Sequence, residues 1–295
     1  MKPRIDALLA SAGRPTLSYE FFPPKSEEAA TQLTAVVREL RSLGPDFVSI
    51  TRTGGGAPPT IELTARFQEE FAIPAMSHLT CAGYTQEELG GLLDDAWSRG
   101  IRNVLALRGD AAPGSTSFSV TTGGFANASD LVTFAAARHD FCLGVAGYPE
   151  GHPQALNLTR DAEYLKLKQD NGADFVITQL FYDNEDFLRW RDRVRGLGVT
   201  LPLIAGILPI GNVAQIKRFL TLCGAKIPHE LLLRLEALEH DGPSVEAAGR
   251  DHAVKQCEGL LAEGVAGLHF YTLNRSEATA HIVSNLKASG LLSRI

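Results

Sequence analysis

The chain of 295 residues has the composition of an ordinary globular protein, with 44% hydrophobic and 21% charged residues. Its formal net charge of -6 argues against the basic surface that a nucleic-acid-binding protein needs. No segment approaches the roughly 20 consecutive apolar residues of a membrane-spanning helix, so we expect no membrane association. The four widely spaced cysteines form no C-x-x-C pair and predict reduced thiols in a cytoplasmic protein.

Strand-like and helix-like segments alternate along the chain. The first stretch, 1–13, has a short apolar run interrupted by Asp6, so it predicts a surface helix and not a secretion signal. Eight apolar runs bounded by turn residues then predict strands. These runs begin at Leu17, Phe47, Ala75, Asn103, Cys142, Phe175, Leu201 and Gly267.

Amphipathic stretches with helix-start signals lie between these runs. The stretch 26–44 opens with a serine and two glutamates, keeps its apolar residues on one face and ends at a glycine. Thr85 and Glu88 have capping-box spacing at the start of another, and 184–198 follows the same pattern. Because parallel strands need a crossover connection, this alternation predicts parallel β-α units.

Eight such units, in a chain slightly longer than the roughly 250 residues typical of the fold, predict a (β/α)8 TIM barrel. We expect one α/β domain over residues 1–295. The surplus residues 225–264 contain further helical patterns, which we interpret as extra helices inserted before the last strand. A doubly wound open sheet is the alternative.

Polar residues gather at the predicted C-terminal ends of the strands, where a barrel carries its active site. The strand starts are apolar by comparison. The polar residues are Glu20, Thr51, Arg52, His78, Thr80, Arg108, Asp110, Tyr148, Glu150, Gln179, Asp183, Thr272, Asn274 and Arg275.

Glu20 lies within an apolar strand that stops at a proline pair. Period-two alternation places Ser18, Glu20 and Phe22 on one face, which we expect to be the barrel interior. Partial burial favours the protonated form of a carboxyl group, so Glu20 could donate a proton near neutrality. The alternative is a purely structural ion pair with Arg52 or Arg108.

Other stretches are less specific. Gly109, between Arg108 and Asp110, allows a sharp turn or a close approach to a ligand, although a surface turn with an Arg–Asp pair is the alternative. His78 alone fits a buried core histidine, and no metal-ligand set accompanies it, so we predict no metal. The stretch 53–59 lacks G-x-G-x-x-G spacing, and neither a P-loop nor a G-x-S-x-G elbow is present.

Eight motifs in chain order together resemble the 5,10-methylenetetrahydrofolate reductase family of FAD-dependent barrels: SYEFFPPKS, FVSITRTGGG, SHLTC, ALRGD, GYPEGHP, ITQLFYD, GILPI and HFYTLNR. The match runs from about Ser18 to Arg275, and the chain is similar to the short bacterial members, without a C-terminal regulatory domain. The resemblance implies reduction of 5,10-methylenetetrahydrofolate to 5-methyltetrahydrofolate for methionine synthesis. NADH or NADPH would first reduce FAD, which would then pass hydride to the folate. It also implies a homo-oligomer.

The resemblance assigns roles to individual residues. Glu20 would be the general acid that protonates folate N10, and Asp110 would contact the pterin and disfavour the anionic reduced flavin. The other folate positions would be Gln179, Gln215, Phe219 and Arg275. The matching FAD positions are Thr51, His78, Arg108, Gly109, Asp110, Ala128, Ala146, Tyr148, His152, Ala155, Asp161 and Lys168.

Three residues depart from the family pattern. Arg52 stands where an aromatic residue is usual, Asn127 replaces an aromatic residue, and Tyr164 replaces a smaller polar one. Two alternatives therefore stay open beside the reductase. One is the same scaffold acting in reverse or on another folate adduct, and the other is a barrel that has lost catalysis and only binds.

Overall fold

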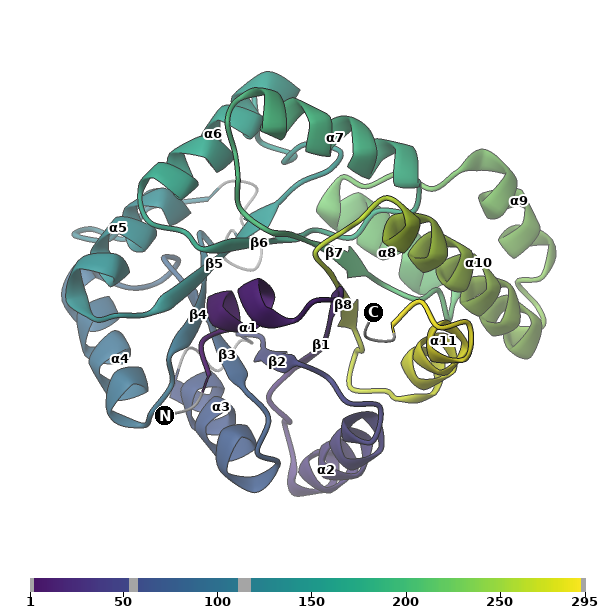
Figure 1. Cartoon of the computed structure of the whole chain (residues 1–295), viewed down its shortest axis with the longest axis horizontal. Coiled ribbons are helices and arrows are strands. Elements are labelled where there is room, and N and C mark those ends of the chain that lie inside the picture. Colours follow the sequence, from purple (N-terminus) through teal and green to yellow (C-terminus); the bar gives the residue numbers. More distant parts are fainter. Residues whose placement is uncertain (1–2, 53–57, 111–117, 293–295) are drawn as a thin grey trace.

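Eight parallel strands close into a barrel in the order β1 to β8, with β8 pairing back to β1 (Figure 1). The computed structural model describes residues 3–52, 58–110 and 118–292, so most of the glycine-rich stretch 53–59 lies outside the described residues. Closure confirms the predicted (β/α)8 barrel and excludes the open sheet. The strands are β1 (Thr16–Phe21), β2 (Phe47–Ile50), β3 (Ala75–Thr80), β4 (Asn103–Leu107), β5 (Cys142–Gly147), β6 (Phe175–Thr178), β7 (Leu203–Ile207) and β8 (Gly267–Tyr271).

Helices surround the barrel and begin where the sequence signals predict. Ser26 accepts a hydrogen bond from the backbone N–H of Ala29, and Thr85 and Glu88 form the predicted capping box. The helices are α1 (Ile5–Ser11), α2 (Glu27–Arg41), α3 (Pro58–Glu70), α4 (Gln86–Ser98), α5 (Ala128–Arg138), α6 (Leu158–Asp170), α7 (Asn184–Gly196), α8 (Val213–Cys223), α9 (His229–Ala237), α10 (Gly242–Ala262) and α11 (Glu277–Ala288). None of these described helices combines the length and apolar character that crossing a membrane requires.

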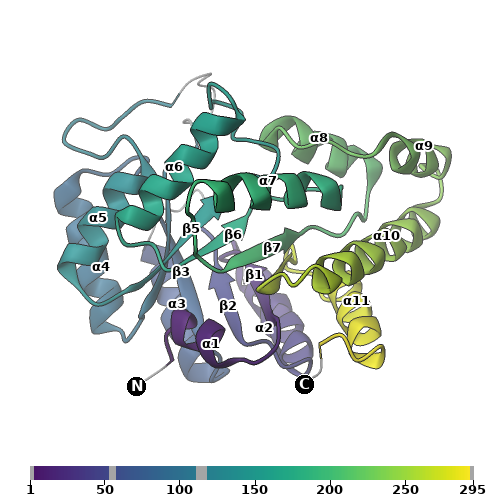
Figure 2. The ribbon, with the colours of Figure 1, turned by 45° about the horizontal axis from the view of Figure 1, so that its top comes forward.

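Three helices, α8, α9 and α10, separate β7 from β8, which confirms the predicted extra helices before the last strand. The long α10 packs against α11 and α7 and so occupies the ring position between them (Figure 2). A separate apolar cluster joins Ile216 of α8, Leu235 of α9 and Val245 of α10 to the loops after β6 and β7. This cluster fixes α8 beside the C-terminal end of the barrel.

The N-terminal helix α1 closes the opposite end of the barrel, where Figure 1 shows it lying across the ring of strands. Ile5 has no exposed surface and packs with Phe47, Met76 and Phe175, which come from three different strands. Its backbone N–H donates to Asn103 Oδ1 over 2.8 Å. The predicted helix is therefore present, but its description as a surface helix was wrong, because it plugs the core.

Replacing Ile5 with alanine tests this plug. We expect I5A to lower the free energy of unfolding by about 2 to 4 kcal/mol, because it removes buried methyl groups and leaves a cavity among side chains of several strands. Urea denaturation measures the loss. Ala10→Ser, at an exposed position of the same helix, should change stability by less than about 0.5 kcal/mol. Equal stability of I5A and the unmodified protein would show that α1 does not seal the barrel.

Candidate active site

A cavity of about 400 Å³ opens at the C-terminal ends of the strands. We name it the mouth cavity. It is lined by residues from the ends of most strands and by two residues of α8, Phe219 and Cys223. The predicted site residues that it brings together are Glu20, Thr51, His78, Arg108, Gly109, Asp110, Ala146, Tyr148, His152, Gln179 and Phe219. The predicted clustering of strand ends is thus observed, while the roles of the residues stay predictions.

Glu20 lies at the base of the mouth cavity, and only 9% of its surface is exposed. Its Oε2 is 3.5 Å from His78 Nε2, 3.4 Å from His269 Nε2 and 3.5 Å from Ser49 Oγ. Among the residues that the structure describes, these two histidines are the basic side chains within 4.0 Å of the Glu20 carboxyl group. Arg52, the alternative partner, instead donates to Thr80 Oγ1 and the Ala82 carbonyl. The inward orientation of Glu20 that alternation predicts is therefore present without an arginine pair.

The groups around Glu20 carry little positive charge. Burial lowers the pKa of His78 to about 4, although the Glu20 carboxylate opposes this shift. His78 is therefore neutral near pH 7. The Tyr271 hydroxyl donates to the Thr178 carbonyl oxygen over 2.5 Å, and burial raises its pKa well above the usual value. Within the described part of the chain Glu20 thus makes no salt bridge to an arginine or a lysine.

His269 and Tyr271 were missed by the sequence analysis, which considered only the polar residues after the last strand. In the structure Ser18 pairs with His269 and Glu20 with Tyr271 in the register of β1 against β8. The signal was available in the run GLHFY, because period-two alternation places these two residues on one face. Their position beside Glu20 required the strand register.

The turn after β4 directs Arg108 and Asp110 to the mouth cavity. Gly109 has φ of +88°, and a Cβ atom there would lie 2.7 Å from the Ala82 Cβ. Only glycine fits such a left-handed and crowded position, as the sequence predicted. Arg108 also lies over the Phe118 ring, 4.7 Å from its centre. Asp110 is exposed at the cavity rim.

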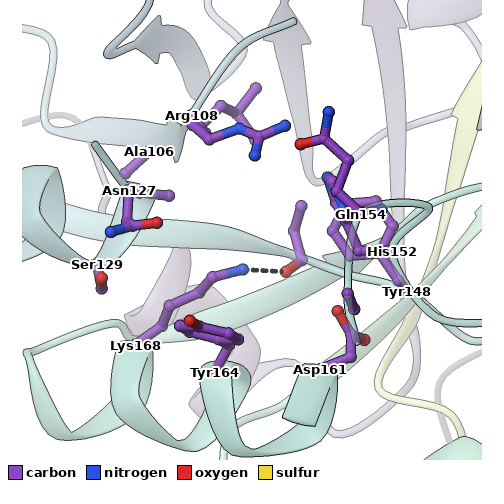
Figure 3. A pocket seen from close by; sticks show the side chains of 14 residues that line it. Ala106, Arg108, Asn127, Ser129, Tyr148, His152, Gln154, Asp161, Tyr164 and Lys168 are labelled. Atoms are coloured by element: carbon purple, nitrogen blue, oxygen red, sulfur yellow. Dashed lines mark hydrogen bonds between the residues drawn. The ribbon is translucent and has the colours of Figure 1, made fainter. Parts of the chain in front are cut away.

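A second cavity of about 220 Å³ lies beside the mouth cavity and shares four of its predicted residues, Arg108, Ala146, Tyr148 and His152. We name it the side cavity (Figure 3). It adds the predicted residues Ala128, Ala155, Asp161 and Lys168, so all predicted flavin positions line one of these two joined cavities. Two of the departures also line it. Asn127 starts α5 by donating its backbone N–H to Asp130, and Tyr164 is 52% exposed.

Lys168 gives the side cavity a cationic group inside the protein. Its Nζ donates to the Ala146 carbonyl oxygen over 2.9 Å, as Figure 3 shows. Burial lowers its pKa to about 8, against the opposing effect of Asp161. The neighbouring His152 accepts the Gln154 backbone N–H at Nδ1, so its Nε2 is the free donor. Such donors and cations suit the oxygens of a phosphate or diphosphate.

Two predicted folate residues lie elsewhere. Gln215 and Arg275 line an adjoining cavity of about 300 Å³ that shares Tyr271 and Leu273 with the mouth cavity. Arg275 is exposed. The predicted folate set is thus divided between two neighbouring cavities, a separation that the sequence analysis did not foresee.

A group of metal-ligand types lies at the opposite end of the barrel. Donor atoms of Asp6, Cys142 and Asp174 are within 4.8 Å of one another. Arg4 lies between the carboxylates, 2.9 Å from Asp6 and 3.9 Å from Asp174. Since the Arg4 guanidinium already occupies the space between these carboxylates, we do not assign a metal site there.

Comparison with known proteins identifies the family to which these motifs belong. The family model described as methylenetetrahydrofolate reductase matches residues 4–287. The 5,10-methylenetetrahydrofolate reductase of Escherichia coli is 38% identical over 276 residues, which are 93% of this chain and 91% of that protein. The probable methylenetetrahydrofolate reductase (NADH) of rice is 40% identical over 94% of this chain, which spans only 49% of the rice protein. The chain thus covers about half the length of its plant relatives.

Solved structures support the fold. A protein from Clostridium thermocellum, described as binding two copies of 5-methyl-5,6,7,8-tetrahydrofolic acid, superposes with a TM-score of 0.68 at 17% identity. The superposition covers 97% of this chain and 98% of that one. At this identity the likeness extends to the barrel alone.

The buried amine of Lys168 should lower the stability of the free protein. Its pKa falls from 10.5 to about 8 on folding, so the unfolded chain binds more protons between these values and stability rises with pH there. We expect Lys168→Met to be more stable than the unmodified protein at pH 7 by about 1 to 2 kcal/mol, after allowance for screening and for the lost hydrogen bond.

Urea denaturation at pH 7 and pH 10 tests this, since the difference should shrink once the pH passes the folded-state pKa of about 8 and the buried amine is neutral. Lys166→Met on the same helix removes only a surface pair with Asp170 and should have little effect at either pH. A less stable K168M at pH 7 would contradict the assignment of a desolvated amine.

Proposed function

Because the chain belongs to the methylenetetrahydrofolate reductase family, we propose that it reduces 5,10-methylenetetrahydrofolate to 5-methyltetrahydrofolate, with electrons from NADH or NADPH that pass through FAD. The observation that carries this proposal is Glu20. It is a buried carboxyl group at the base of an open cavity, next to a neutral imidazole. A purely structural carboxylate would be expected to pair with a cation.

The side cavity and the mouth cavity together fit FAD. Arg108 and Lys168 offer positive charge for the diphosphate, and the joined cavities provide one continuous lining from Asp161 to Thr51. Among the described residues Lys168 donates one hydrogen bond, to the Ala146 carbonyl, so its remaining protons are available to an anionic ligand. When bound, FAD would supply the hydride transfer between nicotinamide and folate.

Glu20 would act as the general acid of the folate reaction. Its O–H bond would break as a new N–H bond forms at folate N10, and the bond between N10 and the bridging carbon would open. That carbon then becomes electrophilic. Before this step Glu20 lies buried beside the neutral His78, and within the described part of the chain it pairs with neither an arginine nor a lysine.

The folate would extend from the mouth cavity toward the cavity that holds Gln215 and Arg275. Asp110, Gln179 and Phe219 line the first part and offer a carboxylate, an amide and an aromatic ring to the pterin. Arg275 lies in the adjoining cavity, where its guanidinium could pair with the carboxylates of the folate tail. The two shared residues connect these parts into one path.

We extend the proposal to the setting of the enzyme. All four cysteines are free thiols, which suits a reducing compartment such as the cytoplasm. The partners would be small molecules, folate and a nicotinamide dinucleotide, with neither nucleic acid nor membrane. We expect a homo-oligomer, as implied by the family resemblance.

The proposal is tested by a visible absorption spectrum and by two half-reactions in stopped flow. The purified protein should show flavin absorption, NADH or NADPH should bleach it, and methylenetetrahydrofolate should restore it. A protein that takes up no FAD, or a reduced protein that folate does not reoxidise, would reject the proposal. Reduction of the flavin by methyltetrahydrofolate at a far higher rate than by nicotinamide would favour the reverse direction.

The Glu20→Gln variant separates the acid from the rest of the site. We expect E20Q to bind FAD and to be reduced by nicotinamide normally, because neither step needs this proton. Reoxidation by methylenetetrahydrofolate should fall by ~10²- to 10⁴-fold, the range of a positioned general acid. Glu69→Gln, at an exposed position of α3, is the control. Unchanged reoxidation in E20Q would remove Glu20 from this role.

Replacement of Asp110 by asparagine tests electrostatic control of the flavin. A negative charge at the rim of the mouth cavity opposes the negative charge of the reduced flavin, so D110N should make the flavin easier to reduce. Because Asp110 is exposed, solvent should keep the rise in midpoint potential small. A redox titration followed by absorption measures it, with Asp192→Asn on the exposed face of α7 as the control. Equal potentials in D110N and the unmodified protein would count against the argument.

A further inference from the structure

His269 lies directly beneath Glu20 and has no exposed surface. Its Nε2 is 3.4 Å from Glu20 Oε2, and its Nδ1 is 2.8 Å from Ser18 Oγ. The ring stacks on Phe47 with an angle of 17° between their planes, and Ser49 Oγ lies 3.4 Å from Nε2. The imidazole is thus held at both nitrogens and on one face inside the barrel.

The Ser18 hydroxyl sets the tautomer of this imidazole. Its Oγ lies 3.3 Å from the Leu268 carbonyl oxygen, which can only accept a hydrogen bond. When Ser18 donates there, its oxygen accepts the Nδ1–H of His269. A neutral imidazole has one N–H, so Nε2 then presents a lone pair to Glu20. That lone pair can accept a hydrogen bond from the Glu20 carboxyl group at 3.4 Å or from the Ser49 hydroxyl at the same distance.

We infer that His269 is a positioning residue which, oriented by Ser18, keeps one proton on the Glu20 side chain and holds that carboxyl group at the base of the mouth cavity. The inference rests on the proposed function, because the stored proton matters only if Glu20 is the general acid. In each turnover the Glu20 O–H bond breaks, an N–H bond forms on the folate, and the carboxylate regains a proton from solvent at the mouth.

The other groups that face Glu20 do not replace His269. His78, on β3, lies 3.5 Å from the same carboxylate oxygen, but its Nε2 makes no hydrogen bond within the described part of the chain. Burial keeps it neutral, with a pKa of about 4. Ser49 on β2 is uncharged, and the hydroxyl of Tyr271 on β8 is engaged with Thr178. Arg108 and Asp110, after β4, line the same cavity without pairing with Glu20, and Arg52, after β2, donates to Thr80 and Ala82 instead.

Two substitutions of His269 separate its contacts. The shorter side chain of H269N can keep a hydrogen bond to Ser18 but does not extend to Glu20, whereas H269Q is long enough to reach the position of Nε2. We expect reoxidation of the reduced enzyme by methylenetetrahydrofolate to be ~10- to 100-fold slower in H269N, with partial recovery in H269Q. Reduction by nicotinamide should be unchanged in both.

The pH profile distinguishes this role from a loss of packing. As the pH is raised, the rate of the folate half-reaction should decline at a lower pH in H269N than in the unmodified enzyme, because the carboxyl proton of Glu20 has lost its hydrogen-bond acceptor. The double variant E20Q/H269N should be no slower than E20Q, since the two residues act as one unit. An additive loss in the double variant would overturn the inference.

Infrared spectroscopy of the flavin-free protein gives a second readout that does not depend on turnover. The carbonyl band of the protonated Glu20 carboxyl group is assigned by its absence in E20Q. As the pH is raised, this band should disappear at a lower pH in H269N than in the unmodified protein. Equal rates, pH profiles and infrared bands in H269N and the unmodified protein would reject the role of His269.

The outcomes also separate this inference from the proposed function. If folate fails to reoxidise the unmodified enzyme, the proposed function itself is rejected. If the unmodified enzyme is active and H269N behaves identically, only the role of His269 is rejected. Should H269N fail to fold, Ser18→Ala removes the partner of Nδ1 with a small change of volume. It should move the pH profile in the same direction, and an unmoved profile would count against the inference.

Discussion

The site depends on one constraint, the burial of a carboxyl group inside a closed barrel without a cation beside it. The register of β1 against β2 and β8 places Glu20 opposite Ser49 and Tyr271, with Ser18 and His269 one inward step below. These four neighbours are hydroxyl or imidazole groups, with Phe47 beside His269. A barrel interior filled only by aliphatic side chains would expel such a carboxyl group, and an arginine would fix it in the ionised form. The polar layer avoids both outcomes.

Arg52, Arg108 and Lys168 bring positive charge to the two cavities without pairing with Glu20. Arg108 lines both joined cavities, and Lys168 reaches the side cavity from α6, the helix that follows β5. This arrangement separates Lys168, which suits an anionic ligand, from the carboxyl group of Glu20. The separation follows from the barrel itself, because adjacent strands deliver their C-terminal residues to different sectors of one rim.

The sequence predicted those features that depend on local pattern. The apolar run beginning at Phe47 predicts a strand, and the spacing of Thr85 and Glu88 predicts a helix start. The alternation of such strand and helix patterns was therefore enough to predict the barrel. The pairing of Glu20 with His269 could not be predicted in this way, because the two residues are 249 positions apart and meet only through the closure of β1 on β8. The burial of Ile5 likewise depends on strands that follow it in the chain. The flavin positions came from motif resemblance and not from periodicity.

The contacts of Arg52 explain how a departure from the family pattern can leave the site intact. Its guanidinium donates to Thr80 and to the Ala82 carbonyl, and it lies 4.9 Å from the centre of the Tyr84 ring. The Ala82 methyl group in turn packs against Gly109, which has no room for a side chain. Arg52 therefore holds the loop after β3 by hydrogen bonds, and this loop packs against the turn that carries Arg108 and Asp110. Because the donors of Arg52 are directed to this loop, Arg52 stabilises the rim of the mouth cavity. The two oxygen atoms that it contacts stabilise the positive charge of the guanidinium. An aromatic residue at this position could pack against the same loop, but it could not donate these hydrogen bonds.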